Sequence, residues 1–157
     1  MSRKRKELSD SEKHTIDELV AAYFSPKVFP CGEEPRGVVR YDKREQMYGG
    51  TGTVYLLQLF GEGELVNNRI GAYMILPGSE DSAGFHTHGT RNEQELYVVM
   101  SGEGEYHEKE NAHGEVKTVP VRKGSVTTVR GEAHHAVSNT GDEPLIIFVI
   151  TTNEPAG

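Results

Sequence analysis

The sequence predicts an all-β domain, a sandwich or a barrel, preceded by one amphipathic helix. Three observations lead to this prediction. After Gly52 the chain alternates short β-rich runs with turns that contain glycine or proline. No helical pattern separates these runs, so the sheets should be mainly antiparallel. Before them lies a single stretch in which apolar residues recur at helical spacing.

The helix is expected close to the N-terminus. Ser9 and Glu12 have the spacing of a capping box, at which a helix begins. Ser25-Pro26 ends the helical pattern, because proline disfavours helix in the residue before it. One face carries an apolar stripe of Ile16, Leu19, Val20, Tyr23 and Phe24. A helix this short is not stable without tertiary contacts. Its apolar stripe must therefore pack against either this domain or a neighbouring subunit.

The strands are expected after an irregular segment at 30–52. Nine of them are predicted, at residues 53–60, 70–76, 85–88, 95–101, 103–108, 115–121, 125–129, 133–138 and 145–151. No repeat of the whole unit is visible, so we expect a single barrel. The chain then divides into 1–29, a basic tail with the helix, and 30–157, the β domain.

Composition and charge narrow the classes of partner. Hydrophobic residues make up 35% of the chain and charged residues 26%, as in a globular domain. The net charge of −7 argues against a nucleic-acid partner, and the basic run at 3–6 is expected to be a solvated tail.

The apolar runs are too short to span a bilayer, and no signal-peptide pattern is present. We therefore expect a cytoplasmic protein with no membrane partner. Cys31 is the single cysteine, so no internal disulfide can form.

A group of histidines and a glutamate indicates a metal site. His86 and His88 lie two residues apart, so they project from the same face of a strand. Glu95 begins an apolar run, where an unpaired carboxylate would be costly to bury unless a cation accompanied it. His134 and His135 are neighbours on a later strand, so only one of them should face inward. Val137 lies on the face of His135, which favours His135.

These residues resemble the two sequence motifs of the cupins. The run from Gly84 to His88, followed by Glu95 with six residues before Gly102, is similar to the first motif. A second similarity begins at Gly124 and continues with His135, which has three residues between it and Asn139, as in the second motif. The resemblance covers about residues 70–150. It implies a jelly-roll β-barrel with an N-terminal helical arm, and a homodimer in which that arm clasps the partner.

The spacing departs from the family pattern in both motifs. Six residues separate His88 from Glu95 where cupins usually have three or four, and a count of four would make Glu93 the ligand. Glu95 is preferred for its distance to Gly102. Alignment of the second motif on Gly131 would make His134 the ligand in place of His135.

The predicted ligands indicate which metal ions the site could bind. His86, His88, Glu95 and His135 suit one divalent ion per chain, Fe, Mn, Ni, Co, Cu or Zn, with one or two coordination positions left open. The alternative is a metal-free cupin whose histidines form hydrogen bonds in the core.

Two further residues are candidates for roles near the ion. Tyr97 has the parity of Glu95 and is either a proton donor or barrel lining, and Arg130 is either a site for a substrate anion or a solvated strand end.

The resemblance implies a metal-dependent enzyme acting on a small oxygenated molecule. Dioxygenation, decarboxylation, isomerisation and lyase reactions all occur among cupins, and an iron-dependent oxidoreductase of the dioxygenase type is slightly favoured. The alternative is a non-catalytic module that binds an organic acid or a sugar through a metal anchor.

Overall fold

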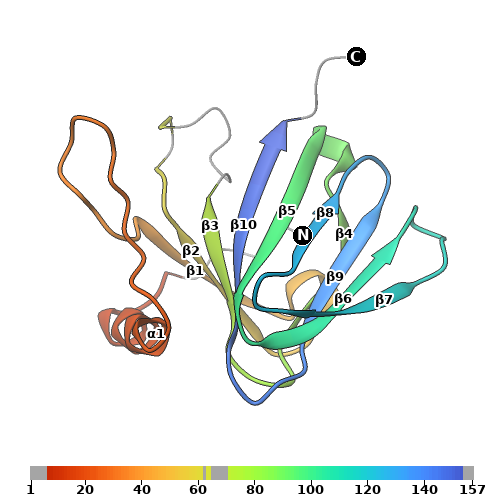
Figure 1. The fold of residues 1–157 in the computed structure, drawn as a ribbon, viewed down its shortest axis with the longest axis horizontal. Helices are drawn as coiled ribbons and strands as arrows, with labels where there is room; N and C mark the ends of the chain where they lie inside the picture. The colour runs from red at the N-terminus through yellow and green to blue at the C-terminus, as the bar shows by residue number, and fades with distance from the viewer. Residues whose placement is uncertain (1–6, 62, 65–70, 154–157) are drawn as a thin grey trace.

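The computed structural model describes residues 7–61, 63–64 and 71–153 (Figure 1). The basic run at 3–6 and residue 70 of the second predicted strand lie outside these residues. In chain order the elements are α1 (Asp10–Ala21), β1 (Arg40–Glu45), η1 (Met47–Gly49), β2 (Thr53–Gln58), β3 (Ala72–Leu76), β4 (Ser82–Thr87), η2 (Gly89–Arg91), β5 (Glu93–Ser101), β6 (Glu103–Lys109), β7 (Lys117–Arg122), β8 (Val126–Val129), β9 (His134–Asn139) and β10 (Leu145–Asn153).

The strands form two sheets whose inner faces enclose the core. The larger sheet has the order β1-β2-β3-β10-β5-β8 and the smaller one β4-β9-β6-β7, and all the strand pairings are antiparallel. Met74 and Val99 of the larger sheet and Tyr106 and Val137 of the smaller one belong to one buried cluster. The prediction of an all-β fold with mainly antiparallel strands is confirmed.

The nine predicted strands correspond to β2 through β10, and the prediction of an irregular segment at 30–52 is wrong because it contains β1. This strand reads Arg-Tyr-Asp-Lys-Arg-Glu, with charged residues on both faces. Its outer face contacts α1 and its inner face borders a polar cavity. Neither environment requires the apolar alternation by which strands are recognised in a sequence.

Helix α1 covers part of the outer face of the larger sheet (Figure 1). Ser9 and Glu12 form the predicted capping box, with the Ser9 side chain accepting from the Glu12 backbone N–H at 3.1 Å. The helix ends at Ala21, before the predicted stop at Ser25-Pro26. Within the described residues no helix is long and apolar enough to cross a membrane.

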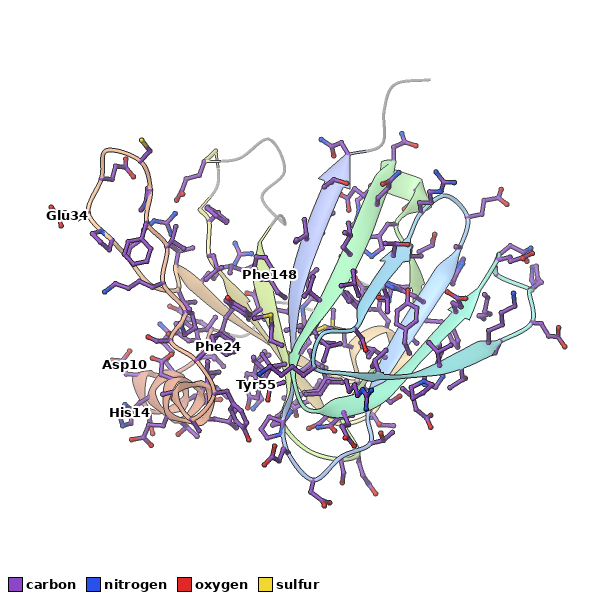
Figure 2. The ribbon with its side chains drawn as sticks, viewed as in Figure 1. Asp10, His14, Phe24, Glu34, Tyr55 and Phe148 are labelled. Atoms are coloured by element: carbon purple, nitrogen blue, oxygen red, sulfur yellow. The ribbon has the colours of Figure 1, made fainter. Side chains whose placement is uncertain are left out.

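The apolar stripe of α1 packs against this chain's own sheet. Ile16 and Val20 are buried in a cluster with Leu57, Ile75 and Ile146. Figure 2 shows Asp10 and His14 on the side of the helix away from the strands and Phe24 between the helix and the sheet. Polar contacts add to this packing, since the Tyr41 hydroxyl donates to Asp17 at 2.6 Å.

Candidate metal centre

Four buried side chains meet between the two sheets. His86 lies on β4, His88 directly follows β4, Glu95 lies on β5 and His135 on β9. One nitrogen or oxygen atom of each lies within 4.8 Å of the corresponding atoms of the other three. The structure therefore brings together the four residues that the sequence predicted as metal ligands.

Strand pairing explains why residues so distant in sequence meet. His86 and His135 are direct partners in the antiparallel register of β4 and β9. Glu95 projects from the opposite sheet, where it pairs with Thr151 of β10. Period-two alternation along β5 turns Glu93, Glu95 and Tyr97 to the interior, and all three are buried.

The distances between the donor atoms are short. The Nε2 atoms of His86 and His135 are 3.0 Å apart. Oε1 of Glu95 lies 3.0 Å from Nε2 of His88 and 3.3 Å from Nε2 of His135. One carboxylate oxygen and three imidazole nitrogens thus converge on a common point.

The electrostatics disfavour the charged forms of His86 and His135 and favour the ionised form of Glu95. Burial, together with the nearby His135, lowers the pKa of His86 to about 3, and burial also lowers the pKa of His135. Burial alone would raise the pKa of Glu95, but its contacts with His135 and His88 outweigh burial and bring the pKa below its ordinary value. Neutral imidazoles and an ionised carboxylate are the protonation states in which these groups bind a metal ion.

Outer contacts orient three of the four ligands. Nδ1 of His86 lies 2.8 Å from the carbonyl oxygen of Gly84, and Nδ1 of His135 lies 2.9 Å from the hydroxyl of Tyr106. Thr151 donates to Oε2 of Glu95 at 3.1 Å. Such partners fix the ring orientation and the tautomer of metal-binding histidines, which directs the other nitrogen to the ion.

The donor set fits a divalent transition-metal ion. Both ring nitrogens of the buried His88 are without a hydrogen bond within the described residues, although Nε2 is close to the Glu95 carboxylate. A buried imidazole in that state is costly unless a ligand occupies it. Three imidazoles and one carboxylate suit Mn, Fe, Co, Ni, Cu or Zn, and they leave coordination positions open toward the cavity.

The cavity beside these residues has a volume of about 100 Å³. Its walls are mixed, with apolar side chains from β2, β3 and β10 and polar ones from β1 and β2. Three of the candidate ligands, His86, His88 and Glu95, line the cavity. Other lining residues include Arg40, Asp42, Arg44, Tyr48, Gln58, Met74, Tyr97 and Thr151. Sequence reasoning missed Arg40, Asp42, Arg44, Tyr48 and Gln58; the period-two Arg-x-Asp-x-Arg pattern of β1 is a signal that could have found three of them.

Two tyrosine rings stack on the imidazoles. The Tyr97 ring stacks on His135 with centroids 4.7 Å apart, and burial and then the charge of Glu95 raise the pKa of Tyr97 well above its ordinary value. Tyr97 therefore keeps its proton. The Tyr48 ring stacks on His86 with centroids 4.0 Å apart, at the rim of the cavity, where 45% of Tyr48 remains exposed.

The alternative residues of the sequence prediction lie around the cluster. Glu93 is buried behind His88, with Oε2 3.5 Å from Nδ1 of that ring. His134 points away, with Nδ1 2.9 Å from the Glu132 carbonyl oxygen. Arg130 is exposed just after β8 and is not among the residues that line the cavity.

Comparison with known proteins agrees with this architecture. The sequence model of the family described as "Cupin domain" matches residues 72–151. An oxalate-binding protein from Thermotoga maritima is 31% identical over 110 residues, which cover 69% of this chain and 84% of the relative. A glucose-6-phosphate isomerase from Pyrococcus horikoshii is 34% identical over 65 residues, covering 41% of this chain and 34% of the relative.

A solved structure shares the same fold. The crystal structure of a predicted oxalate decarboxylase from Thermotoga maritima superposes with a TM-score of 0.61 at 29% identity, and the match covers 72% of this chain and 91% of that one. The family match spans β3 to β10 and includes all four candidate ligands. The chain belongs to the cupin family.

Proposed function

We propose that this protein binds one divalent transition-metal ion through His86, His88, Glu95 and His135, and on that ion a small dicarboxylic acid of the oxalate type. The observation that carries the proposal is the convergence of four buried donor atoms within 4.8 Å beside an open cavity. When bound, the ion would supply a Lewis acid that holds carboxylate oxygens.

The choice of ligand class is supported by the size of the cavity and by the relatives. A cavity of about 100 Å³ has room for a small acid beside the four donor atoms. A relative that the chain matches over most of its length carries the name oxalate-binding protein, and a similar structure is called a predicted oxalate decarboxylase.

Metal content and ligand binding test the proposal together. Purified protein is stripped with a chelator, reloaded with Mn(II), Fe(II), Co(II), Ni(II) or Zn(II), and analysed for bound metal. Near-stoichiometric metal in the wild type and its loss in Glu95→Gln are expected. Calorimetric titration with oxalate should then show binding to the loaded protein and none to the stripped one. Wild-type protein that takes up no metal would contradict the proposal.

Decarboxylation is the turnover that we propose for the same site. Breaking a C–C bond with loss of CO₂ leaves an electron pair on the remaining carbon, and that carbon must take up a proton. Tyr97 lines the cavity beside Glu95 and holds a proton, which makes it the candidate donor. Formate and CO₂ released in equal amounts from oxalate, and lost in Tyr97→Phe, would support turnover; binding without product would support the non-catalytic alternative.

Three further predictions from the sequence can each be tested by a separate measurement. The iron-dependent dioxygenase reaction predicts oxygen uptake by Fe(II)-loaded protein in an oxygen electrode. The homodimer predicts twice the chain mass of 17.4 kDa in light scattering. The cytoplasmic location predicts recovery of the native protein in the cytosolic fraction.

A further inference from the structure

Strand β1 places a row of charged side chains on the wall of the metal cavity. Arg40, Asp42 and Arg44 alternate along the strand and all line the cavity. Lys43, on the other face of the strand, turns outward and pairs with Glu12 of α1 at 3.5 Å. The inner face of β1 is therefore polar and is separated from the charges of the outer face.

The two arginines of this row differ in their partners. Arg40 pairs with Asp42 at 3.3 Å, so the buried carboxylate of Asp42 is already matched by a cation. Nε of Arg44 is buried and has no hydrogen-bond partner within the described part of the chain. A buried guanidinium donor without an acceptor is unfavourable, and the Arg44 side chain lines the cavity, where an anion could pair with its guanidinium.

A second residue of the cavity wall also has an unmatched polar atom, an acceptor that calls for a donor and not for an anion. Oε1 of Gln58 is buried without a hydrogen bond among the described residues. Gln58 of β2 is the direct partner of Arg40 in the register of β1 and β2. The same line of cross-strand neighbours continues through Ala72 of β3 and Val149 of β10 to Tyr97 of β5. This line of neighbouring residues connects β1 with β5, the strand that carries Glu95.

The formal charges of the lining favour a dianion. The positive charges of Arg40 and Arg44 balance the negative charges of Asp42 and Glu95. Imidazoles that ligate a metal ion are neutral, so a bound divalent ion leaves the cavity with two positive charges. A dicarboxylate neutralises both, whereas a monocarboxylate leaves one unmatched.

We propose that Arg44 determines specificity by pairing with the carboxylate of the ligand that is not bound to the metal ion. This inference rests on the proposed function and deepens it. The site should select dicarboxylates over monocarboxylates because the metal ion takes one acidic group and the guanidinium of Arg44 takes the other. The planar fork of arginine suits a carboxylate, and lysine would replace its charge without its paired hydrogen bonds.

The test compares a dicarboxylate with a monocarboxylate on metal-loaded protein. Malonate and acetate are titrated calorimetrically into Mn(II)-loaded wild type, Arg44→Gln and Arg44→Lys. Arg130→Gln is the matched control, since Arg130 is an exposed arginine outside the cavity. Arg44→Gln should weaken malonate binding about 10- to 100-fold and change acetate binding less than about twofold. Arg44→Lys should recover part of the loss, and Arg130→Gln should match the wild type.

Metal content and circular dichroism of each variant separate this role from a structural one. Equal weakening of malonate and acetate in Arg44→Gln, or no weakening of either, would overturn the role of Arg44 while the metal site stands. Metal-loaded wild-type protein that binds no dicarboxylate would overturn both this inference and the proposed function.

Discussion

The Nε2 atoms of His86 and His135 lie 3.0 Å apart, at directly paired positions of β4 and β9. Nδ1 of His86 contacts the Gly84 carbonyl oxygen, which can only accept, so the neutral ring keeps its lone pair on Nε2. Nδ1 of His135 contacts the Tyr106 hydroxyl, which can either donate or accept. For His135 to direct a lone pair from Nε2 to a metal ion, its proton must be on Nδ1 and be donated to Tyr106.

Substitution of Tyr106 by phenylalanine should therefore weaken metal binding. The change removes the acceptor for the Nδ1 proton of His135, and loss of such an outer partner typically lowers metal affinity about 10- to 100-fold. Competition with a chelating dye measures the effect. Tyr55→Phe is the matched control, because Tyr55 packs on the outer side of the sheet beside the α1 cluster. Unchanged affinity in Tyr106→Phe, or an equal loss in Tyr55→Phe, would contradict the assignment.

The two buried glutamates should have unequal effects on the metal. Glu95 places Oε1 near two of the imidazoles, whereas Glu93 lies beside the outer nitrogen of His88, at 3.5 Å. Glu95→Gln should leave less than about a tenth of the wild-type metal content after dialysis, and Glu93→Gln should lower affinity about 10-fold. Elemental analysis and dye competition give both values. Greater metal loss from Glu93→Gln would show that Glu93 is the ligand.

Metal-free protein should lose stability as the pH falls from 6.5 toward 3. The pKa of His86 is lowered from its ordinary value of 6.5 to about 3, so in this range the unfolded chain binds a proton that the folded chain excludes. The free energy of unfolding then rises with pH, and its full value is present above 6.5. The lowered pKa of Glu95 acts in the same direction below its ordinary value of 4.5.

Urea denaturation of chelator-treated protein at pH 7, 6, 5 and 4 checks this expectation. His86→Gln removes one titrating group and should make the pH dependence shallower. His113→Gln, at an exposed position in the turn between β6 and β7, is the control variant and should keep the wild-type pH dependence. A free energy of unfolding that stays constant between pH 7 and 5 in the wild type would contradict the lowered pKa of His86.

An alanine at position 84 should destabilise the protein and disturb the cavity rim. A Cβ on Gly84 would collide with the backbone oxygen of Tyr48 and approach the Gly50 nitrogen to 2.8 Å, so η1 could not remain against β4. Overpacking of this kind costs about 1–3 kcal/mol. Urea denaturation of Gly84→Ala measures the cost, with Gly37→Ala as a control at a glycine without a positive φ, where an added Cβ would meet only the Pro26 carbonyl oxygen at 4.0 Å. Equal stability of Gly84→Ala and the wild type would contradict the close contact.

The sequence by itself determined the fold class and the four candidate ligands. Strands β2 to β10 border a buried apolar core, so their side chains alternate and can be recognised. The same alternation places His86 and His88 on one face and Glu95 with Tyr97 on another. The choice of His135 over His134 followed from its parity with Val137, which is buried as expected.

Only the tertiary structure decided what surrounds those ligands. Strand β1 was missed because its side chains face α1 on one side and a polar cavity on the other, so its sequence carries no apolar period. The contact of Tyr106 with His135 and the place of Arg44 in the metal cavity depend on strand pairing between segments far apart in the chain. Local alternation gives the face of each side chain, but the partner across the barrel is set by which strands pair and in which register.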